Sequence, residues 1–432
     1  MPSVIPSDPV QMLVGAVKAN DVDGVRRSLT QYPELKGRLN DALPGLAFDS
    51  APIHAAVSRG NREMIEVLLD AGADINVRSR WWAGGFGVLD SADPALVPFL
   101  LDRGAVVDVH AAARLGMRDR LEQLISANPS LVNSRGGDGQ TPLHFASTIE
   151  IAQYLLDRGA DIDVRDVDHE STAAQYMIRD RQDVARYLVA RGCRTDILMG
   201  AALGDLECVR SHLDKDPSSV RTIVSDRYFP KQDPRSGGTI YIWTLGAHKN
   251  AHVIAREFGH QPVLDLLMDR SPSGLKLAVA CELGDQPTIE ALLKSDPNLP
   301  QTLGEEDRRK LADAAQDNNT EAVRRMVAAG WPLDARGQHG ATALHWAAFH
   351  GNAVMTRDLL QRNAPIDLRD SDYNGTPIFW AIYGSVHGWH CERGDYAGTV
   401  EALLDAGSTA PPVAPDLEAS PAVLDVLRRR AH

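Results

Sequence analysis

The sequence predicts an all-α solenoid built from about twelve helix-pair units. The segments 50–79, 139–166 and 339–370 share one pattern of turn, short helix, glycine turn, second helix and exit turn. Hydrophobic residues make up 44% of the 432 residues and aromatic residues only 6%, which suits small-faced helices that approach closely. A chain of this length exceeds the usual single compact core, but a solenoid avoids that limit because it grows along one axis.

Within a unit, each recurring residue has a local structural reason. Thr141 before Pro142 places a capping hydroxyl ahead of a proline at the first helical position. Gly60 and Gly351 break the first helix, and Gly159 follows the end of a second helix. This pattern resembles the ankyrin repeat, a unit of about 33 residues with a Thr-Pro-Leu-His signature. The resemblance implies a stack of units with one side left to bind a partner.

A narrower resemblance concerns residues 229–260 and 387–407, which look like a bacterial group of long single-domain ankyrin proteins. It implies the architecture and a bacterial cytosol, but no reaction. In the insertion between units seven and eight, the alternating run Thr-Ile-Tyr-Ile-Trp predicts a strand, and Gly237–Gly238 predicts a hairpin turn. The predicted parts of this single solenoid (1–432) are an N-terminal cap (1–50), a first repeat block (51–215), the β-containing insertion (216–243), a second block (244–384), a loop insertion (385–398) and the last repeat with its cap (399–432).

Composition restricts the partners. The net charge of −13 argues against nucleic acid, because phosphate binding depends on clustered Lys and Arg. The four cysteines form no Cys-x-x-Cys pair, so neither a zinc knuckle nor a disulfide framework is expected. The first residues lack the basic and apolar regions of a signal peptide, and no apolar run is long enough to span a membrane. We therefore expect a cytoplasmic protein without a membrane partner.

Five of the 14 histidines fall at the histidine position of the repeat signature. We predict that their imidazoles bridge backbone groups of adjacent turns and belong to the scaffold. These residues are His54, His110, His144, His252 and His345.

The tips of the β-turn fingers and the ends of the first helices are predicted to face one concave groove. Adjacent Trp81 and Trp82 are the strongest signal, because two exposed indoles at a turn usually mark a contact. The alternative explanation is turn chemistry alone, which the Asp residues satisfy. The predicted binding residues are Trp81, Trp82, Asp138, Gln140, Tyr241, Trp243, His339, His350, Tyr373 and Trp389.

The loop insertion places His387 and His390 at a spacing that can chelate a divalent metal ion. No third ligand follows from the sequence, so the metal signal is weak and no cofactor is predicted.

Two functions stay open. The first is a recognition scaffold that binds a protein partner or a small polar ligand, which the absence of any known catalytic motif favours. The second is a hydrolase or lyase that acts on a sugar or other polar substrate by acid–base or metal-assisted chemistry. This second function requires residues 168–170 and residues 387–395, which lie six repeats apart, to come together. The catalytic candidates are Asp168, His169, Glu170, His387, His390 and Asp395.

Overall fold

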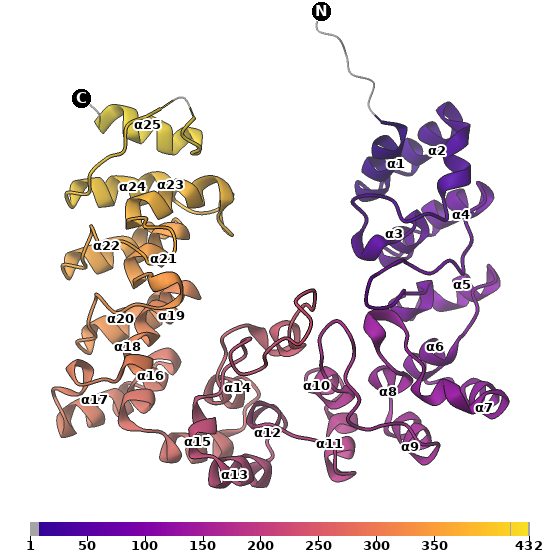
Figure 1. The fold of residues 1–432 in the computed structure, drawn as a ribbon, viewed down its shortest axis with the longest axis horizontal. Coiled ribbons are helices and arrows are strands. Elements are labelled where there is room, and N and C mark those ends of the chain that lie inside the picture. Colours follow the sequence, from indigo (N-terminus) through magenta and orange to yellow (C-terminus); the bar gives the residue numbers. More distant parts are fainter. Residues whose placement is uncertain (1–7, 415, 431–432) are drawn as a thin grey trace, which may run out of the picture. The chain divides into compact units, whose positions relative to one another are not determined.

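The computed structural model describes residues 8–414 and 416–430 (Figure 1). Parts of both predicted caps, at residues 1–7, 415 and 431–432, lie outside the described residues. The chain divides into two compact units. Unit 1 comprises residues 1–203 and 223–247, and unit 2 comprises residues 204–222 and 248–432.

Unit 1 consists of short helices that stack as successive pairs (Figure 1). Its α-helices are α1 (Pro9–Lys18), α2 (Val22–Gln31), α3 (Pro52–Ser58), α4 (Arg62–Asp70), α5 (Val97–Asp102), α6 (Val109–Arg114), α7 (Arg118–Ala127), α8 (Pro142–Phe145), α9 (Ile149–Asp157), α10 (Ala173–Met177), α11 (Gln182–Ala190) and α12 (Ile197–Leu203). Short 3-10 turns are η1 (Pro33–Arg38), η2 (Ala47–Asp49), η3 (Val88–Asp90), η4 (Pro129–Asn133) and η5 (Gly137–Gly139), and η7 (Ile242–Gly246) is a π-helical turn.

Unit 2 repeats the same arrangement. Its α-helices are α13 (Leu206–Lys215), α14 (Ala251–Glu257), α15 (Gln261–Arg270), α16 (Ser273–Leu283), α17 (Gln286–Ser295), α18 (Glu305–Arg308), α19 (Lys310–Gln316), α20 (Thr320–Ala328), α21 (Ala343–Phe349), α22 (Ala353–Gln361), α23 (Pro377–His387), α24 (Tyr396–Asp405) and α25 (Pro421–Arg430). Its 3-10 turns are η6 (Pro217–Arg221), η8 (Leu299–Gln301) and η9 (Gln338–Gly340).

Local sequence explains where the helices begin and how closely they pack. Asn61 and Asn352 cap the second helices α4 and α22 by accepting from the backbone N–H groups three residues later. The first helices bury small residues, such as Ala347 and Ala348 of α21, so that α21 can pack against both α19 and α23. The core of each unit is therefore a row of helix–helix interfaces, and no pair of helices buries its apolar face alone.

The structure confirms the scaffold role predicted for the signature histidines. Nε2 of His144 donates to the carbonyl of Ser171 over 3.1 Å, while its Nδ1 accepts from the N–H of Thr141. His345 repeats this arrangement, and His54 and His110 likewise donate to carbonyls of the following turn. His252 is the exception, because its Nε2 bonds to the hydroxyl of Ser271. The other four imidazoles thereby join their own helix to the following finger.

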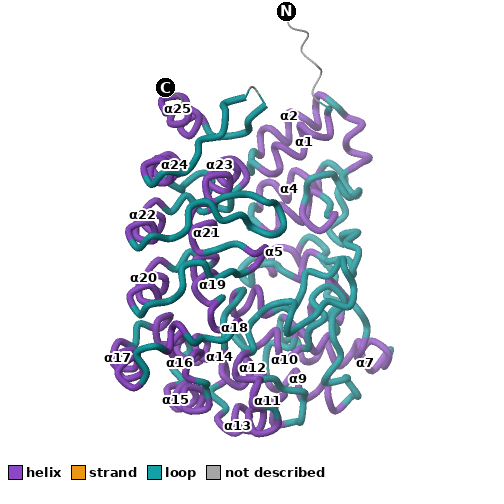
Figure 2. Tube along the Cα trace, turned by 60° about the vertical axis from the view of Figure 1, so that its left-hand side comes forward, coloured by secondary structure: helices purple, strands orange, loops and turns teal. Residues whose placement is uncertain are grey.

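The predicted strand in the insertion is wrong. The described residues contain no strand, and Figure 2, whose key reserves orange for strands, shows helices and loops only. A strand would bury every second residue, but the adjacent Ile240 and Tyr241 are both buried, followed by Leu245. The hydroxyl of Tyr241 donates to Asp196 over 2.8 Å, which fixes the turn against α12. Gly237 forms no hairpin turn, because its N–H donates to the carbonyl of Asp168 instead.

Candidate functional site

The chemistry-bearing residues gather on the fingers, the loops that join the second helix of one repeat to the first helix of the next. Asp138 in unit 1 and His339 in unit 2 occupy equivalent fingertips, and both have a positive φ, of 54° and 61°. In each case the tip carbonyl accepts an N–H from the following finger, from Val167 and from Ser371, over 2.8 Å. Successive fingers are thus hydrogen-bonded tip to tip in both units.

A buried carboxylate organises each following finger. In unit 1, Asp166 accepts from the N–H groups of His169 and Ser171 and from the hydroxyl of Tyr176, the last over 2.9 Å. In unit 2, Asp370 accepts three backbone N–H groups and the indole N–H of Trp380, also over 2.9 Å. We call this arrangement of buried acid, backbone N–H groups and ring donor the finger frame. It holds the exposed tip residues in the same places in both units.

In unit 1 the frame carries a cluster of acids around one imidazole. Nδ1 of His169 lies 3.4 Å from Asp166, 3.8 Å from Asp168 and 3.9 Å from Asp138, and 3.0 Å from the hydroxyl of Tyr176. Burial raises the pKa of Asp138 to about 6, and Asp168 and Asp166 shift it in the same direction. Burial opposes the charge on His169, but the surrounding carboxylates outweigh it and raise its pKa. We call Asp138, Asp168 and His169 the acidic cluster.

The insertion of residues 223–247 docks on this finger. The carboxylate of Glu170 accepts from the backbone N–H groups of Gln232 and Asp233 over 2.8–2.9 Å. Ser236 and Gly237 both donate to the carbonyl of Asp168. A cavity of about 310 Å³ opens where the insertion meets His169 and Glu170. Among the residues predicted as acids or bases, Glu170 is thus engaged in holding the insertion.

The two tryptophans predicted as contacts lie on the preceding finger. Trp81 packs edge-on against the exposed Phe48, and the guanidinium of Arg235, from the insertion, lies 4.3 Å from the ring centre of Trp82. This finger rests closely on the next one, because a Cβ at Gly137 would lie 2.3 Å from the ring of Phe86. Both indoles are half-buried within unit 1.

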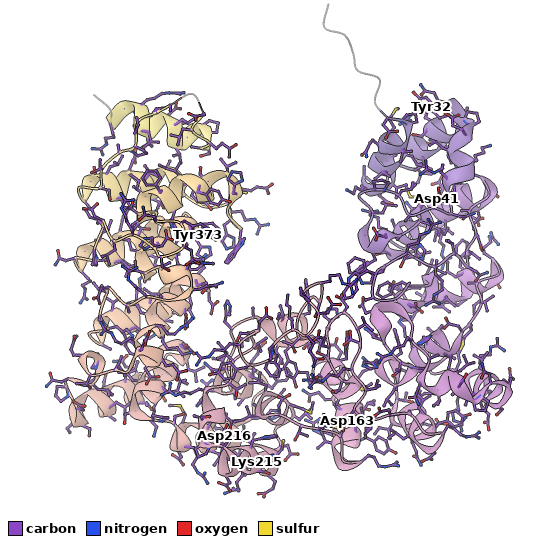
Figure 3. The ribbon with its side chains drawn as sticks, viewed as in Figure 1. Tyr32, Asp41, Asp163, Lys215, Asp216 and Tyr373 are labelled. Carbon is purple, nitrogen blue, oxygen red and sulfur yellow. The ribbon has the colours of Figure 1, made fainter. Side chains whose placement is uncertain are left out.

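In unit 2 the equivalent fingers carry aromatic rings instead. His339, Tyr373 and Trp389, all predicted as binding residues, line one pocket of about 460 Å³. Figure 3 labels Tyr373 beside α21 and α23, on the side away from α22 and α24. Tyr373 is 69% exposed and Trp389 is 64% exposed. The other lining residues are Trp346, Phe349, Gly375, Phe379, Trp380 and Tyr383. We call this the aromatic pocket.

A second, basic pocket of about 320 Å³ lies on the other side of the Trp389 loop, residues 388–395. It is lined by Arg357 and Arg393 together with His350 and His390. The rings of His350 and His390 are 5.1 Å apart, and Trp389 lies 5.6 Å from His350, so the loop forms a wall of both pockets. Within the described part of the chain, neither guanidinium makes a hydrogen bond or an ion pair.

Most of the remaining predicted residues are buried or have internal partners. Gln140 and Tyr241 are buried, while Trp243 is 72% exposed on the insertion. His350 is also buried and donates to the carbonyl of Gln316. Two of the three catalytic candidates of unit 2 are engaged too, because His387 bonds to Glu418 and Asp395 caps α24.

The sequence reading missed the finger frame and most of the aromatic pocket. The frame had a signal, because Asp166 and Tyr176 are ten residues apart, as are Asp370 and Trp380. The weak metal signal at His387 and His390 stays a prediction. Among the described residues, the group of three donors close enough to share an ion is the acidic cluster, and it contains neither His387 nor His390.

Comparison with known families agrees with this geometry. The model for ankyrin repeats (3 copies) matches residues 109–199, 277–370 and 311–409, together more than half of the chain, and the single ankyrin-repeat model matches residues 49–80. The chain belongs to the ankyrin-repeat family. Ankyrin repeats generally mediate protein–protein interaction, so the chain is an interaction scaffold. None of its described helices is both long and apolar enough to cross a membrane.

Three curated proteins illustrate how the repeats are shared. Palmitoyltransferase Hip14 of Drosophila melanogaster is 27% identical over 29% of the chain, and transient receptor potential cation channel subfamily A member 1 of Homo sapiens is 24% identical over 82% of it. Ankyrin repeat and SAM domain-containing protein 6 of Mus musculus is 28% identical over 27% of it. The chain spans only 14–26% of the length of these relatives. The narrower resemblance to a bacterial group stays a prediction.

Proposed function

We propose that the chain is a non-catalytic recognition scaffold and that unit 2 binds its protein partner at the aromatic and basic pockets. The observation that carries this proposal is the aromatic pocket itself. Its rings include four exposed side chains, and exposed aromatic clusters are costly in water unless they serve a contact. Aromatic residues and arginine are also the residues that dominate binding energy at protein interfaces. The exposed rings are Tyr373, Phe379, Tyr383 and Trp389.

The two pockets favour a particular kind of partner segment. The aromatic pocket suits an apolar side chain, which would stack on Trp389 and Trp346, rings already 6.0 Å apart. The basic pocket suits an acidic group, because the guanidinium groups of Arg357 and Arg393 have no ion-pair partner among the described residues and a guanidinium pairs bidentately with carboxylate or phosphate. Asp395 also lines this pocket, but its carboxylate caps α24. The preferred ligand is therefore a peptide with an apolar anchor beside an acidic residue.

Selection of short peptides displayed on phage against the full chain tests this proposal. We expect enriched peptides to combine an apolar or aromatic residue with an acidic one. Combining Trp389→Ala with Phe379→Ala should weaken binding of an enriched peptide at least about tenfold in a fluorescence anisotropy titration. Trp243→Ala is the matched control, because it removes an exposed indole from unit 1 and should leave binding unchanged.

The arginines need a separate comparison. Replacing both Arg357 and Arg393 by Ala should weaken binding of the same peptide. Arg362→Ala, at an exposed position at the end of α22, should leave that binding unchanged. Enrichment of basic peptides, or equal binding by the Trp389 and Phe379 double variant, would contradict the proposed site.

The catalytic alternative of a hydrolase or lyase acting on a sugar or other polar substrate has less support. Three of its six candidates have structural contacts: Glu170 holds the insertion, Asp395 caps a helix and His387 pairs with Glu418. Their predicted acid–base roles stay a hypothesis.

A further inference from the structure

The acidic cluster of unit 1 has the geometry of an ion site. One donor atom from each of Asp138, Asp168 and His169 lies within 4.8 Å of the others, and Nδ1 of His169 is 3.8–3.9 Å from a carboxylate oxygen of each acid. Around a metal ion with bonds of about 2.1 Å, neighbouring ligand atoms lie roughly 3.0–3.4 Å apart. Nδ1 of His169 and each of the two carboxylate oxygens therefore need to approach by about half to one ångström to share an ion.

Comparison with unit 2 shows why the acidic cluster favours a bound cation. The positions equivalent to Asp138 and Asp168 are His339 and Asp372, which form a hydrogen bond with each other over 2.7 Å. In unit 1 both positions are acidic, and the buried carboxylate of Asp166 lies beside them. Three carboxylates around one imidazole leave an excess of negative charge in a largely buried place. A bound cation would offset that excess.

An independent observation points the same way. Asp138 is 7% exposed, yet its Oδ1 has no hydrogen-bond partner among the described residues. The indole N–H of Trp81 acts on the same carboxyl group and lowers its pKa, but it does not complete a hydrogen bond to Oδ1. A buried carboxylate oxygen without a donor costs free energy that is normally recovered by a ligand, a water molecule or an ion. Asp166 differs, because its carboxylate accepts from two backbone N–H groups and from the hydroxyl of Tyr176.

We infer that Asp138, Asp168 and Nδ1 of His169 bind a divalent first-row metal ion such as Mn²⁺ or Zn²⁺, with water completing its coordination. The donor set favours this class, because an imidazole suits Zn²⁺ better than Ca²⁺ or Mg²⁺, the two carboxylates suit Mn²⁺, and no sulfur is present to select Cu⁺. The ion joins the two fingertips directly. It also braces the insertion, because Gly237 is hydrogen-bonded to Oδ1 of Asp168 over 3.1 Å.

The test measures binding of MnCl₂ and ZnCl₂ to the full, tag-free chain after treatment with a chelator. We expect one ion per chain by isothermal titration and elemental analysis, and a melting temperature that rises with metal concentration, since a ligand specific for the folded state stabilises it. Asp138→Asn and Asp168→Asn keep the side-chain shape and should weaken binding of the ion at least about tenfold.

The control is Asp372→Asn, the equivalent substitution in unit 2, which should bind the ion as the wild type does. Circular dichroism melts of each chelated variant show whether it folds, and His169→Gln provides a further variant at the third donor. The inference is overturned if the wild-type chain binds no ion, or if Asp138→Asn and Asp168→Asn bind it as tightly as Asp372→Asn.

Discussion

The fingers of units 1 and 2 share one frame but carry opposite chemistry. Asp166 and Asp370 are buried at equivalent positions, and each accepts a ring donor over 2.9 Å from the following helix. On this frame unit 1 presents two more acids and a histidine, whereas unit 2 presents a His–Asp pair and a tyrosine beside a wall of rings. The backbone and the buried acid therefore determine where the tip residues lie, and the tip residues alone determine what they bind.

The segments that pack on the fingers, the insertion in unit 1 and the Trp389 loop in unit 2, also differ in chemistry. In unit 1 the insertion hydrogen-bonds to the finger through Glu170 and the carbonyl of Asp168, so the acids are enclosed. In unit 2 the Trp389 loop stacks on Trp346 and leaves its own indole mostly exposed. A polar, enclosed cluster suits a small ion, and an open, apolar pocket suits the side chain of another protein.

The largest expected effect concerns what the two units share, their neutral signature histidines. Burial lowers the pKa of His144 and of His345 to about 4. Between about pH 6.5 and pH 4 the unfolded chain binds more protons than the folded chain, so stability is complete at the upper end and is lost as the pH falls. The loss should approach about 3 kcal/mol for each histidine.

Thermal melts over this pH range measure the loss. His144→Asn and His345→Asn should each be less stable than the wild type near neutral pH but lose less stability on acidification. An unchanged pH slope in both variants would show that other groups cause the acid sensitivity.

The next effect tests the frame. Asp370→Ala leaves three backbone N–H groups and the indole of Trp380 without an acceptor, and unsatisfied buried donors should cost about 2–3 kcal/mol of stability in total. Asp372→Ala, two residues away and exposed at the tip, is the control and should change the melting temperature little. Chemical denaturation of both variants checks the difference. Equal stability would mean that the frame does not organise the finger.

A smaller effect of opposite sign is expected in unit 1. Asp138→Asn removes a carboxylate whose charge is disfavoured by burial and by the nearby Asp166 and Asp168. The substitution also removes the attraction between Asp138 and His169, but this loss offsets only part of the gain in stability. In the presence of a chelator we expect this variant to be more stable than the wild type by about 1 kcal/mol. Residues that destabilise the folded protein are typical of functional sites. A destabilised variant would show that His169 already balances the acids.

The sequence was sufficient for the repeats because their signals are local. A capping threonine, a glycine turn and a signature histidine each act within one unit, and the histidines lie where the pattern predicts, as His144 and His345 show. The sequence also placed Asp138 at a fingertip of unit 1 and His339 and Tyr373 at fingertips of unit 2, which is where they lie.

What the sequence did not predict depends on contacts between distant segments. The run around Tyr241 alternates like a strand, but the hydroxyl contact with Asp196, 45 residues away, and the burial of Ile240 favour a helical turn. Likewise, the pairing of His169 with Asp138 requires two fingers to meet, which no local spacing shows. From the sequence alone Trp346 looks like an ordinary core residue, because its stacking on Trp389 depends on a loop more than 40 residues away.

The smallest expected effect comes from copying the charge pattern of unit 1 into unit 2. His339→Asp would place two acids at the tips, as in unit 1, but Tyr373 stands where unit 1 has His169, so no imidazole can balance them. Because both side chains are partly exposed, solvent and salt screen their repulsion, and the melting temperature should fall by only about one or two degrees. Melts at low and high salt measure this, and the fall should shrink as salt is added. If the variant instead gains an ion site equal to that of unit 1, the histidine is dispensable and two fingertip acids on the shared frame are enough to bind a metal.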